Sequence, residues 1–453
     1  FDSMRKMMST VHDCDDGLIQ FTKGAPDVIL DRCTHYLKDG KAVPMTKEYA
    51  DGVVAANKAM ADRALRVLAC AERQHSDAPE YEADTLEQGL CFVGLCGMID
   101  PVRPEVKDAI IECREAGITP IMITGDHIDT AVAIAKQLGI VTDRSHAITG
   151  ADLDRMSDEE LDAHIEDYGV YARVQPEHKT RIVNAWRNAG YVTAMTGDGV
   201  NDAPSIKSAD IGVGMGITGT DVTKNVADMV LADDNFATIV KAVKNGRNVY
   251  ANIKRAIQFL LSGNTAGILT VLYASLMGLP VPFAAVHLLF INLLTDSLPA
   301  IALGMEPHTD EVMSEKPRPR NEGILTKHFL YSVGVEGLVI AAATVTAFYL
   351  GLNAGGAAAG QTMAFSTLCL SRLFHGFSCK SQHPVLLTRH FWNNRALLGA
   401  FTIGALLLGL VLLVPALEPL FAVAPLSIGM VGAIVGLAFG SMVVIQLLKL
   451  IRQ

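Results

Sequence analysis

The sequence predicts a protein of two unlike parts: an α/β part with a mostly parallel, doubly wound sheet, followed by an all-α membrane bundle of six transmembrane helices. Half of the 453 residues are hydrophobic, but charged side chains fall mainly before residue 256, and long runs of Leu, Ala, Val and Gly follow. In the first part, short apolar runs that end in Gly-Asp turns alternate with stretches of helical spacing. We therefore place the boundary between the two parts near residue 253.

The composition of the chain argues against several classes of site and partner. The formal net charge is −10, and basic residues form no block outside the loops next to the membrane, so a nucleic-acid partner is not expected. The eight cysteines are scattered without a Cys-x-x-Cys pair, so neither a disulfide framework nor a zinc site is predicted. The sequence opens at Phe1 without an initiator methionine or a leader, which suggests a start inside a domain.

Six apolar stretches approach the ~20 residues that a bilayer requires. They are residues 257–277, 283–303, 329–350, 362–377, 396–414 and 426–448. Lysine and arginine occur in alternate connections and at both ends of this part, and the positive-inside rule places these segments in the cytoplasm. Residues 1–256 are therefore predicted to be cytoplasmic. We expect an integral, multi-pass protein in a lipid bilayer, and the short outside loops favour a bacterial plasma membrane over an internal eukaryotic one.

The second apolar stretch carries four residues at i, i+3, i+4 and i+7, which share one face of a regular helix. They are Asn292, Thr295, Asp296 and Pro299, and Asn264 in the first stretch offers another oxygen. A carboxylate inside a membrane needs a partner or a bound ion, and a hard cation selects carboxylate, amide and hydroxyl oxygens. The pattern predicts a site for a transported cation. The alternative, a polar contact between helices, is equally good for Asn264 alone.

Arg372 in the fourth stretch has two interpretations. It lies near the cytoplasmic end of the stretch, so its side chain can extend to the membrane interface. Alternatively, its charge lies inside the bundle, where it pairs with Asp296 or fills the space that an ion would otherwise occupy.

Two loops in the α/β part carry a pattern typical of phosphoryl transfer. Residues 124–126 end one apolar run and precede a predicted helix over 130–138, and residues 196–204 end a second run. Phosphoryl transfer requires carboxylates that hold Mg²⁺, donors for the phosphoryl oxygens, and a lysine that offsets charge. Asp198 and Asp202 suit the first role, Thr124 and Gly125 the second, and Lys179 the third. For residues 124–126 alone, an ordinary loop is the alternative.

Basic residues near the start of the chain suit a polyphosphate. Lys23 precedes Gly24 in a tight turn, and Arg5, Lys6 and Arg66 add positive charge. Each signal is weak by itself, because a lysine before such a turn is usually an exposed loop residue.

Six segments resemble, in order and spacing, the motifs of P-type ATPases, and the calcium-transporting members are the most similar. The segments are residues 1–8, 23–26, 100–104, 124–126, 196–204 and 292–299. The resemblance covers essentially the whole chain. It implies the C-terminal part of an α+β nucleotide-binding domain over 1–98, a haloacid-dehalogenase-like phosphorylation domain without its N-terminal nucleophile segment over 99–252, and the last six of ten spans over 253–453.

The resemblance also assigns roles by position. The nucleotide-binding positions are Phe1, which would stack on adenine, and Lys6, Lys23, Gly24, Arg66 and Arg173. The catalytic positions are Thr124, Gly125, Asp126, Lys179, Asp198, Asn201 and Asp202, with Asp198 as the Mg²⁺ ligand. The positions of ligands for the transported cation are Asn264, Asn292, Thr295 and Asp296, and Asp100 and Arg103 match a hinge motif.

The family transfers the γ-phosphoryl of ATP to an aspartate in Asp-Lys-Thr-Gly-Thr, and this aspartyl-phosphate drives the membrane part between inward-open and outward-open states. The pentapeptide is absent here, and the resemblance implies that it lies upstream, so the chain alone is expected neither to be phosphorylated nor to transport. The implied function is ATP-driven export of Ca²⁺ from the cytosol. Mn²⁺ or another cation as substrate, and H⁺ as counter-ion, stay open. A catalytically inactive partner or regulatory half, and a membrane-anchored phosphatase, are the alternative functions.

Two positions depart from the pumps with two calcium sites. Gly267 and Arg372 stand where those proteins carry glutamates, and both losses affect the same ion site. We therefore expect a single calcium site, formed by Asn292, Asp296 and a glutamate of an upstream span. In this hypothesis Arg372 takes the place of the lost ion.

Overall fold

The computed structural model describes residues 5–14, 17–98 and 102–451. Contacts divide the chain into two compact units. Unit 1 comprises residues 1–241 and 314–320, and unit 2 comprises residues 242–313 and 321–453. Phe1 and Asp100, to which the sequence assigned roles, lie outside the described residues.

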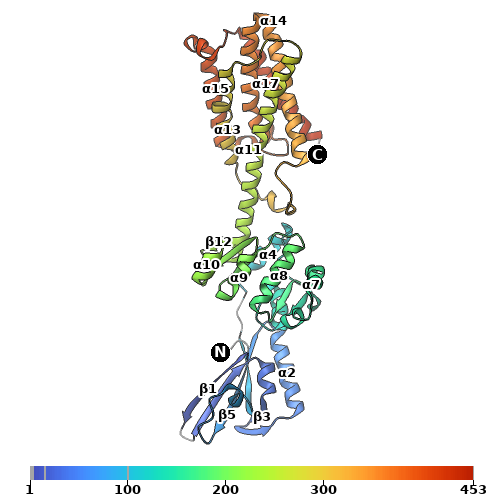
Figure 1. The fold of residues 1–453 in the computed structure, drawn as a ribbon, viewed down its shortest axis with the longest axis vertical. Helices are drawn as coiled ribbons and strands as arrows, with labels where there is room; N and C mark the ends of the chain where they lie inside the picture. The colour runs from blue at the N-terminus through green and yellow to red at the C-terminus, as the bar shows by residue number, and fades with distance from the viewer. Residues whose placement is uncertain (1–4, 15–16, 99–101, 452–453) are drawn as a thin grey trace. The chain divides into compact units, whose positions relative to one another are not determined.

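The first part of unit 1 is a six-stranded sheet with the strand order β1-β2-β5-β6-β3-β4. Its strands are β1 (Met7–Cys14), β2 (Gly17–Gly24), β3 (Cys33–Lys38), β4 (Lys41–Pro44), β5 (Arg66–His75) and β6 (Leu90–Met98). β3 and β6 pair in parallel, and the other neighbours pair antiparallel. Helices α1 (Pro26–Asp31) and α2 (Lys47–Ala61) bury Ile29 and Val53 against this sheet, and α2 lies alongside it in Figure 1; α3 (Ala83–Leu86) precedes β6.

The rest of unit 1 contains two three-stranded parallel sheets. One has the order β7-β9-β8 and the other β10-β11-β12. Their strands are β7 (Met122–Ile123), β8 (Ala147–Thr149), β9 (Val170–Ala172), β10 (Ala194–Gly197), β11 (Ile211–Met215) and β12 (Met229–Leu231). The parallel pairing confirms the prediction from alternating strands and helices, but the described strands form two sheets rather than one. β7 and β10 each lie at an edge of their sheet.

Helices cover these two sheets, as expected for parallel strands whose faces are both buried. They are α4 (Pro104–Glu115), α5 (Ile128–Leu138), α6 (Gly150–Leu153), α7 (Asp158–His164), α8 (Pro176–Asn188), α9 (Ala203–Ser208) and α10 (Asp221–Val226), with the 3₁₀ turns η1 (Arg144–His146), η2 (Ile165–Asp167) and η3 (Val200–Asp202). The helix predicted after residue 126 is α5, which ends at Gly139 in the left-handed conformation. α8 starts with Pro176 in its first turn and buries Ile182 and Trp186 in the core.

Unit 2 is helical, and α14 packs against α15 and α17 (Figure 1). Its elements are α11 (Phe236–Leu276), which begins in unit 1, α12 (Ala285–Phe290), η4 (Ile291–Thr295), α13 (Ser297–Gly304), η5 (Glu311–Met313), α14 (Lys327–Cys379), η6 (Arg389–Trp392), α15 (Arg395–Leu413), η7 (Pro415–Leu417), α16 (Glu418–Phe421) and α17 (Ile428–Ile451). Phe290, Ile340 and Phe365 lie in its core.

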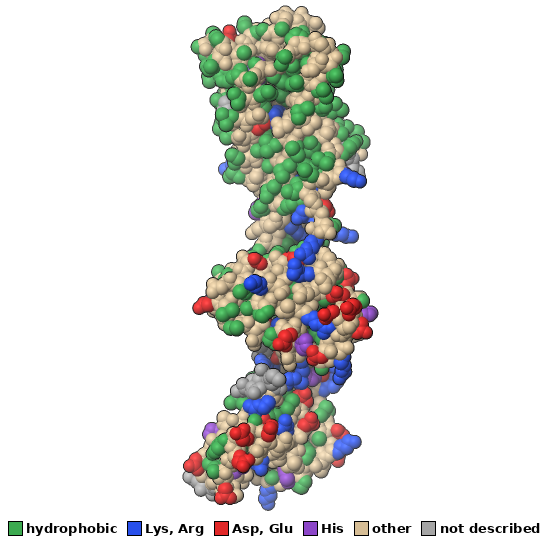
Figure 2. Space-filling model, viewed as in Figure 1, with side chains coloured by type: hydrophobic (Ala, Val, Ile, Leu, Met, Phe, Trp, Pro, Cys, Tyr) green, Lys and Arg blue, Asp and Glu red, His purple; other side chains and the backbone are tan. Residues whose placement is uncertain are grey.

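Within the described residues, five helical segments are long and apolar enough to cross a membrane. They are residues 236–276, 285–304, 327–379, 395–413 and 428–451. The third, α14, contains both the third and the fourth predicted stretches. Two glycines interrupt it: Gly355 and Gly356 have non-helical backbone angles, and Gly356 has a φ of 75°. In Figure 2, hydrophobic side chains dominate the visible face of unit 2, whereas charged side chains gather on unit 1.

Candidate functional site

The loop after β7 is folded around the hydroxyl of Thr124. The Thr124 amide donates to the carbonyl of Tyr171 in β9 (2.9 Å), which fixes the loop to the sheet. The Asp126 amide donates to Thr124 Oγ1 (3.1 Å), and this hydroxyl donates to Asp126 Oδ2 (3.2 Å). Gly125 is exposed, and Arg66 Nε of β5 lies 3.6 Å from Asp126 Oδ1. The loop therefore presents the Thr124 hydroxyl and the exposed backbone of Gly125 at the carboxyl end of a parallel strand.

The loop after β10 contains a charge pair that is largely shielded from water. Lys179 Nζ of α8 donates to Asp202 Oδ1 (2.6 Å), and the two side chains are 21% and 9% exposed. The Gly199 amide donates to Asp202 Oδ2 (3.2 Å), so both carboxylate oxygens are used. A Cβ atom on Gly197 would lie 2.4 Å from Asp202 Cβ, so this position accepts only glycine. Asp202 thus fixes the lysine and closes the loop.

Asp198 and Asn201 are exposed in the same loop, and their side chains are available to a ligand. The backbone of Asp198 is fixed instead, because its carbonyl accepts from the Thr220 amide (2.9 Å). Carboxylate, amide and hydroxyl oxygens are the ligands that Mg²⁺ prefers, so this donor set fits the ion. Ile123 of β7 packs against the cluster that contains Met195 of β10. The two loops therefore follow strands that share a hydrophobic core.

A third loop in this region was not singled out from the sequence. Asp234 accepts hydrogen bonds from the amides of Gly216 (2.6 Å), Ile217 (3.0 Å) and Thr218 (2.7 Å) and from the Thr218 hydroxyl (2.8 Å). Burial alone would raise the pKa of Asp234, but these hydrogen bonds outweigh it and lower the pKa to about 2. The Asp-Asp-Asn sequence at 233–235 was the available signal, since such residues commonly cap loops through their side chains.

The predicted nucleotide-binding residues form two groups: Gly24 and Arg173 make contacts within the protein, and Lys23 and Arg66 are exposed. Gly24 packs tightly on the start of β1, because a Cβ atom there would lie 2.5 Å from the Lys6 carbonyl oxygen. Lys23 is exposed on β2, and Arg66 is exposed on β5. Arg173 follows β9 and donates from both terminal nitrogens to Asp27 (2.9 and 3.0 Å).

Asp27 is a member of this group that the sequence did not reveal. It lies in the first turn of α1, where a carboxylate is favoured, and burial would raise its pKa. The bidentate bonds from Arg173 outweigh burial, so the pKa of Asp27 is lowered. Burial and the charge of Arg173 lower the pKa of Lys6 in turn, while Asp27 opposes this effect. The three charges therefore interact in one region.

In unit 2, Asp296 and Arg372 form a buried ion pair. Arg372 Nη2 lies 2.5 Å from Asp296 Oδ2, and the side chains are 2% and 5% exposed, respectively. Of the two interpretations of Arg372, pairing inside the bundle is confirmed. Arg372 Nη2 also donates to Asn264 Oδ1 (3.3 Å) in α11. Among the residues that the structure describes, Asp296 Oδ1 and Arg372 Nε have no hydrogen-bond partner. One carboxylate oxygen is thus buried and unsatisfied.

Gly263 makes room for this arginine. A Cβ atom at residue 263 would lie 2.3 Å from Arg372 Nε, whereas a Cβ atom at Gly267, one helical turn later in α11, would meet nothing within 4 Å. The guanidinium therefore fills the volume beside Gly263. This close contact could not be predicted from the sequence, because an isolated glycine in a helical pattern has several explanations.

The prediction that four polar residues share one face of a regular α-helix is wrong. Residues 291–295 form a π-helix, η4, in which the Asp296 amide donates to the Ile291 carbonyl (3.0 Å). The wider turn breaks the period of 3.6 on which the prediction rested. Thr295 and Asp296 are buried, whereas Asn292 is exposed, as is Asn264 in α11. The Thr295 hydroxyl donates to the Ile291 carbonyl (2.9 Å), so its oxygen can still accept or bind a cation.

Comparison with known proteins agrees with both parts of this arrangement. Residues 1–105 match the family described as "P-type ATPase, cytoplasmic domain N", and residues 280–451 match "Cation transporting ATPase, C-terminus". The chain that matches these two families also contains the two features described above. One is the Lys179–Asp202 pair in the loop after a parallel strand, and the other is the Asp296 carboxylate inside the helical bundle. The chain belongs to the P-type ATPases.

Among curated proteins, the chain is similar to calcium-transporting ATPases. It is 44% identical to calcium-transporting ATPase 1 of Bacillus cereus, over 100% of this chain and 53% of that protein. It is 45% identical to the calcium-transporting ATPase of Bacillus subtilis, over 93% of this chain and 48% of that protein. It is 43% identical to a calcium-transporting ATPase of Listeria monocytogenes, over 100% of this chain and 51% of that protein. The chain spans about half the length of these relatives.

Proposed function

We propose that the full-length protein is an ATP-driven pump that exports Ca²⁺ from the cytosol through an aspartyl-phosphate intermediate. The observation that carries this proposal is the 43% to 45% identity, over nearly the whole chain, to bacterial proteins named calcium-transporting ATPases. The buried carboxylate of Asp296 supports it, because a bundle that only anchors a protein has no use for an unsatisfied carboxylate oxygen.

We assign residues 1–98 to a nucleotide-binding domain, residues 99–252 to a phosphorylation domain of haloacid-dehalogenase type, and residues 253–453 to the membrane domain. In the first, Lys6, Lys23, Arg66 and Arg173 would attract the phosphates of ATP, because each carries a positive charge and Lys23 and Arg66 are exposed. Gly24 would act indirectly, because its missing side chain lets the start of β1, with Lys6, pack closely beside Lys23 on β2.

In the phosphorylation domain, the Thr124 hydroxyl and the Gly125 N–H would donate hydrogen bonds to the transferred phosphoryl. Lys179 would offset its negative charge, and Asp202 holds this lysine in place at 2.6 Å. Asp198, with Asn201 in support, would hold Mg²⁺, which supplies positive charge to the phosphoryl oxygens when bound. These roles require an acceptor carboxylate, which we place in a segment of the full-length protein outside this chain.

The free edges of β7 and β10 indicate where that segment would bind. Each is the outer strand of a parallel sheet, and Ile123 of β7 packs against the core under β10. The amides of Met122 and Thr124 bond to β9, so the Ile123 amide between them points to the opposite edge. We propose that one further strand lies between β7 and β10 and joins the two sheets. An aspartate at its carboxyl end would then face both Thr124 and Lys179.

We further propose that the membrane domain crosses the bilayer six times. α14 has 53 residues, more than twice the ~20 that one crossing requires, and its interruption at Gly355–Gly356 lies between the third and fourth predicted stretches. Two crossings in α14 and one in each of the other four segments give six. An even number returns the chain to the side from which it started, which places both ends of this part in the cytoplasm of a bacterial cell.

For the transported ion, we propose a single site that uses Asp296, Asn292 and a residue outside this chain. Asp296 Oδ1 is the buried, unsatisfied oxygen, Thr295 precedes it in sequence, and Asn264 Oδ1 accepts a hydrogen bond from Arg372 (3.3 Å). Arg372 contributes a fixed positive charge beside Asp296, where a second cation would be repelled. Export of one Ca²⁺ per ATP follows, and a measured ratio of two would contradict the proposal.

The test is Ca²⁺-dependent formation of acid-stable phosphoenzyme from ATP on the full-length protein. Asp296→Asn keeps the shape of the side chain and removes its charge, and Glu418→Gln, in the connection before α17, is the matched control. We expect the first variant to lose the Ca²⁺ requirement or the reaction, and the second to behave as wild type. If the wild type forms phosphoenzyme without Ca²⁺, the proposed substrate is refuted, and the assignment to the P-type ATPases is unaffected.

A further inference from the structure

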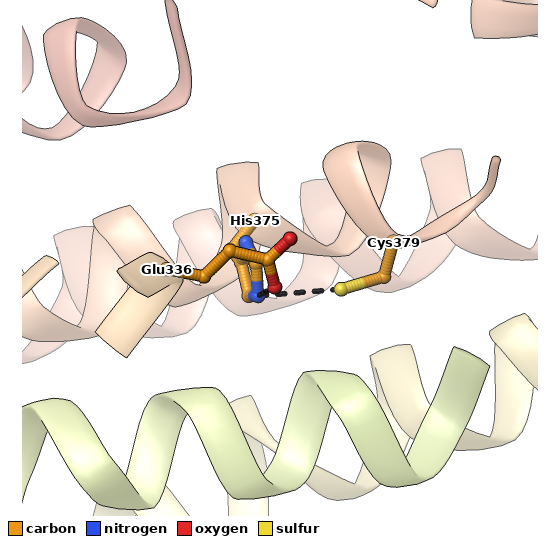
Figure 3. A group of neighbouring side chains, drawn as sticks. All are labelled: Glu336, His375 and Cys379. Atoms are coloured by element: carbon orange, nitrogen blue, oxygen red, sulfur yellow. Dashed lines mark hydrogen bonds and ion pairs between the residues drawn. The ribbon is translucent and has the colours of Figure 1, made fainter. Parts of the chain in front are cut away.

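A second buried polar cluster lies in unit 2, apart from the Asp296–Arg372 pair. It consists of Glu336 in the first half of α14 and His375 and Cys379 in its second half (Figure 3). The three residues are at most 3% exposed. His375 and Cys379 are four residues apart on one helix face, and the Glu336 carboxylate points at the same edge of the imidazole ring. The proposed function uses none of these residues.

Three groups converge on one ring nitrogen. His375 Nε2 lies 3.2 Å from Cys379 Sγ, 3.5 Å from Glu336 Oε2 and 2.6 Å from Ser262 Oγ of α11. A ring nitrogen forms one strong hydrogen bond, so the three neighbours exceed what it can satisfy. His375 Nδ1, by contrast, has no partner among the described residues. A cluster built only for hydrogen bonding would spread its groups over both nitrogens.

We propose that Glu336, His375 and Cys379 form a binding site for one thiophilic divalent cation of the zinc class. The potential ligand atoms all lie within 4.8 Å of one another. With Zn–N and Zn–O bonds of roughly 2.0 to 2.1 Å and a Zn–S bond of about 2.3 Å, tetrahedral ligand atoms lie roughly 3.3 to 3.6 Å apart. The distances of 3.2 Å from His375 Nε2 to Cys379 Sγ and 3.5 Å to Glu336 Oε2 are therefore close to the separations in a filled site.

The surroundings of the cluster also fit a metal site. Gln258 Nε2 of α11 donates to both oxygens of Glu336 (2.9 and 2.8 Å), which orients the carboxylate as an outer partner does in known metal sites. Binding would release the Cys379 thiol proton to solvent, and the resulting thiolate and carboxylate would together neutralise the dication. The nearby cations are already committed, because Lys449 donates to the Ser378 and Ser381 carbonyls and Arg372 pairs with Asp296.

The mixed ligand set selects the type of metal. A thiolate and an imidazole favour Zn²⁺ over the hard cations Ca²⁺ and Mg²⁺, which prefer oxygen ligands alone. The site is therefore distinct in chemistry from the proposed calcium site. No Cys-x-x-Cys signature marks it in the sequence, because its ligands come from the two halves of α14, which the glycines at 355 and 356 separate. A bound ion would cross-link these halves.

The experiment titrates the purified full-length protein in lipid nanodiscs with Zn²⁺ and, separately, with Co²⁺. We expect one tightly bound Zn²⁺ that excess Ca²⁺ or Mg²⁺ does not displace. Co²⁺ should show the charge-transfer absorption of a thiolate ligand. Cys379→Ser and His375→Gln should each weaken Zn²⁺ binding at least 100-fold, and Gln258→Ala roughly 10- to 100-fold, as loss of an outer partner does. Cys369→Ser, which removes another buried thiol of α14, is the matched control and should bind as wild type.

Equal Zn²⁺ binding by the wild type, Cys379→Ser and His375→Gln would overturn the proposal, as would wild-type protein that binds no tight equivalent. If the ligand variants fail to fold, the Co²⁺ spectrum of the unmodified protein decides, because a spectrum without thiolate absorption at one equivalent excludes Cys379 as a ligand. None of these readouts depends on ATP turnover or calcium transport. Their failure would therefore leave the proposed function intact.

Discussion

Single residues in this protein hold two charge pairs in place, and the pairs differ in what surrounds them. In unit 1, both oxygens of Asp202 are satisfied, by Lys179 and by the Gly199 amide. In unit 2, Asp296 keeps one oxygen without a partner among the described residues. A satisfied buried pair positions a side chain, whereas an unsatisfied oxygen is a free ligand. This difference is why we assign a positioning role to Asp202 and an ion-binding role to Asp296.

Replacement of Lys179 tests the first pair. Lys179→Met keeps most of the apolar stem and removes the charge, so phosphoenzyme formation by the full-length protein should fall roughly 100- to 1,000-fold, as for loss of one electrostatic donor in an active site. Lys207→Met, at an exposed position in α9, is the control and should leave the rate within about twofold. A normal rate in Lys179→Met would remove this lysine from the catalytic group.

Replacement of Gly263 tests the space around the second pair. Gly263→Ala places a methyl group 2.3 Å from Arg372 Nε, so the guanidinium must move and the protein should lose about 1 to 3 kcal/mol of stability. Gly267→Ala adds the same methyl group to the same helix where nothing lies within 4 Å, and should be neutral or slightly stabilising. Thermal unfolding of both variants in detergent gives the comparison. Equal unfolding midpoints for the two variants would show that Arg372 moves aside without a loss of stability.

The sequence was informative about residues whose chemistry is unusual for their surroundings. Asp296 and Arg372 stood out because charged residues are rare in apolar stretches, and the structure pairs them. Asp27, Asp234 and Gly263 could not be identified in this way. Acidic residues in loops and single glycines are common, and only the three-dimensional contacts distinguish these from the others.

Among the loops and helices, the hydrophobic pattern of the sequence also predicted some features and missed others. The parallel strands and the helix after residue 126 follow from hydrophobic period and turn residues, which are local properties. The π-helix at 291–295 does not, because a single wide turn is rare and leaves no period of its own in the hydrophobic pattern. The interruption of α14 at Gly355 and Gly356, by contrast, agrees with the short connection that the sequence predicted between its third and fourth apolar stretches.

Asp234 fixes the 216–218 loop, and its lowered pKa makes this contribution depend on pH. A carboxylate whose pKa falls from 3.8 to about 2 on folding stabilises the folded loop above pH 3.8, and the contribution disappears as the pH falls towards 2. Hydrogen-exchange protection of the Ile217 and Thr218 amides should therefore decrease in this acid range. Asp234→Asn should show weaker protection without the acid-dependent decrease, and Asp77→Asn, at an exposed position, should match the wild type. Protection that is constant from pH 4 to pH 2 in the wild type would contradict this expectation.

For the whole molecule, the division of the parallel strands into two sheets is the main departure from the sequence prediction. Strand and helix order predicted one sheet, because nothing in a local pattern reveals that a neighbouring strand comes from a distant segment. The two edge strands are short, which limits pairing with other chains. The full-length protein is therefore expected to differ from this chain at these edges.

Hydrogen exchange of the full-length protein tests the strand that we place between β7 and β10. The Ile123 amide points away from β9, so it should exchange slowly only if another strand accepts its hydrogen bond. We expect protection similar to that of the Met122 and Thr124 amides, with the exposed Gly125 as the fast-exchanging reference. Rapid exchange at Ile123 would indicate that the edge stays open and that the acceptor aspartate binds elsewhere.

The close contact between Gly263 and the Arg372 guanidinium has a consequence for the evolution of related pumps. The guanidinium of Arg372 fills the volume that a side chain at residue 263 would need. Neither position can therefore change independently without a cost in packing. Across an alignment of relatives, the two positions should therefore covary: lineages with arginine at 372 should retain glycine at 263, and lineages with a shorter acid at 372 should tolerate alanine or serine there. The pair would then mark, from sequence alone, which lineages place a fixed positive charge beside the ion site.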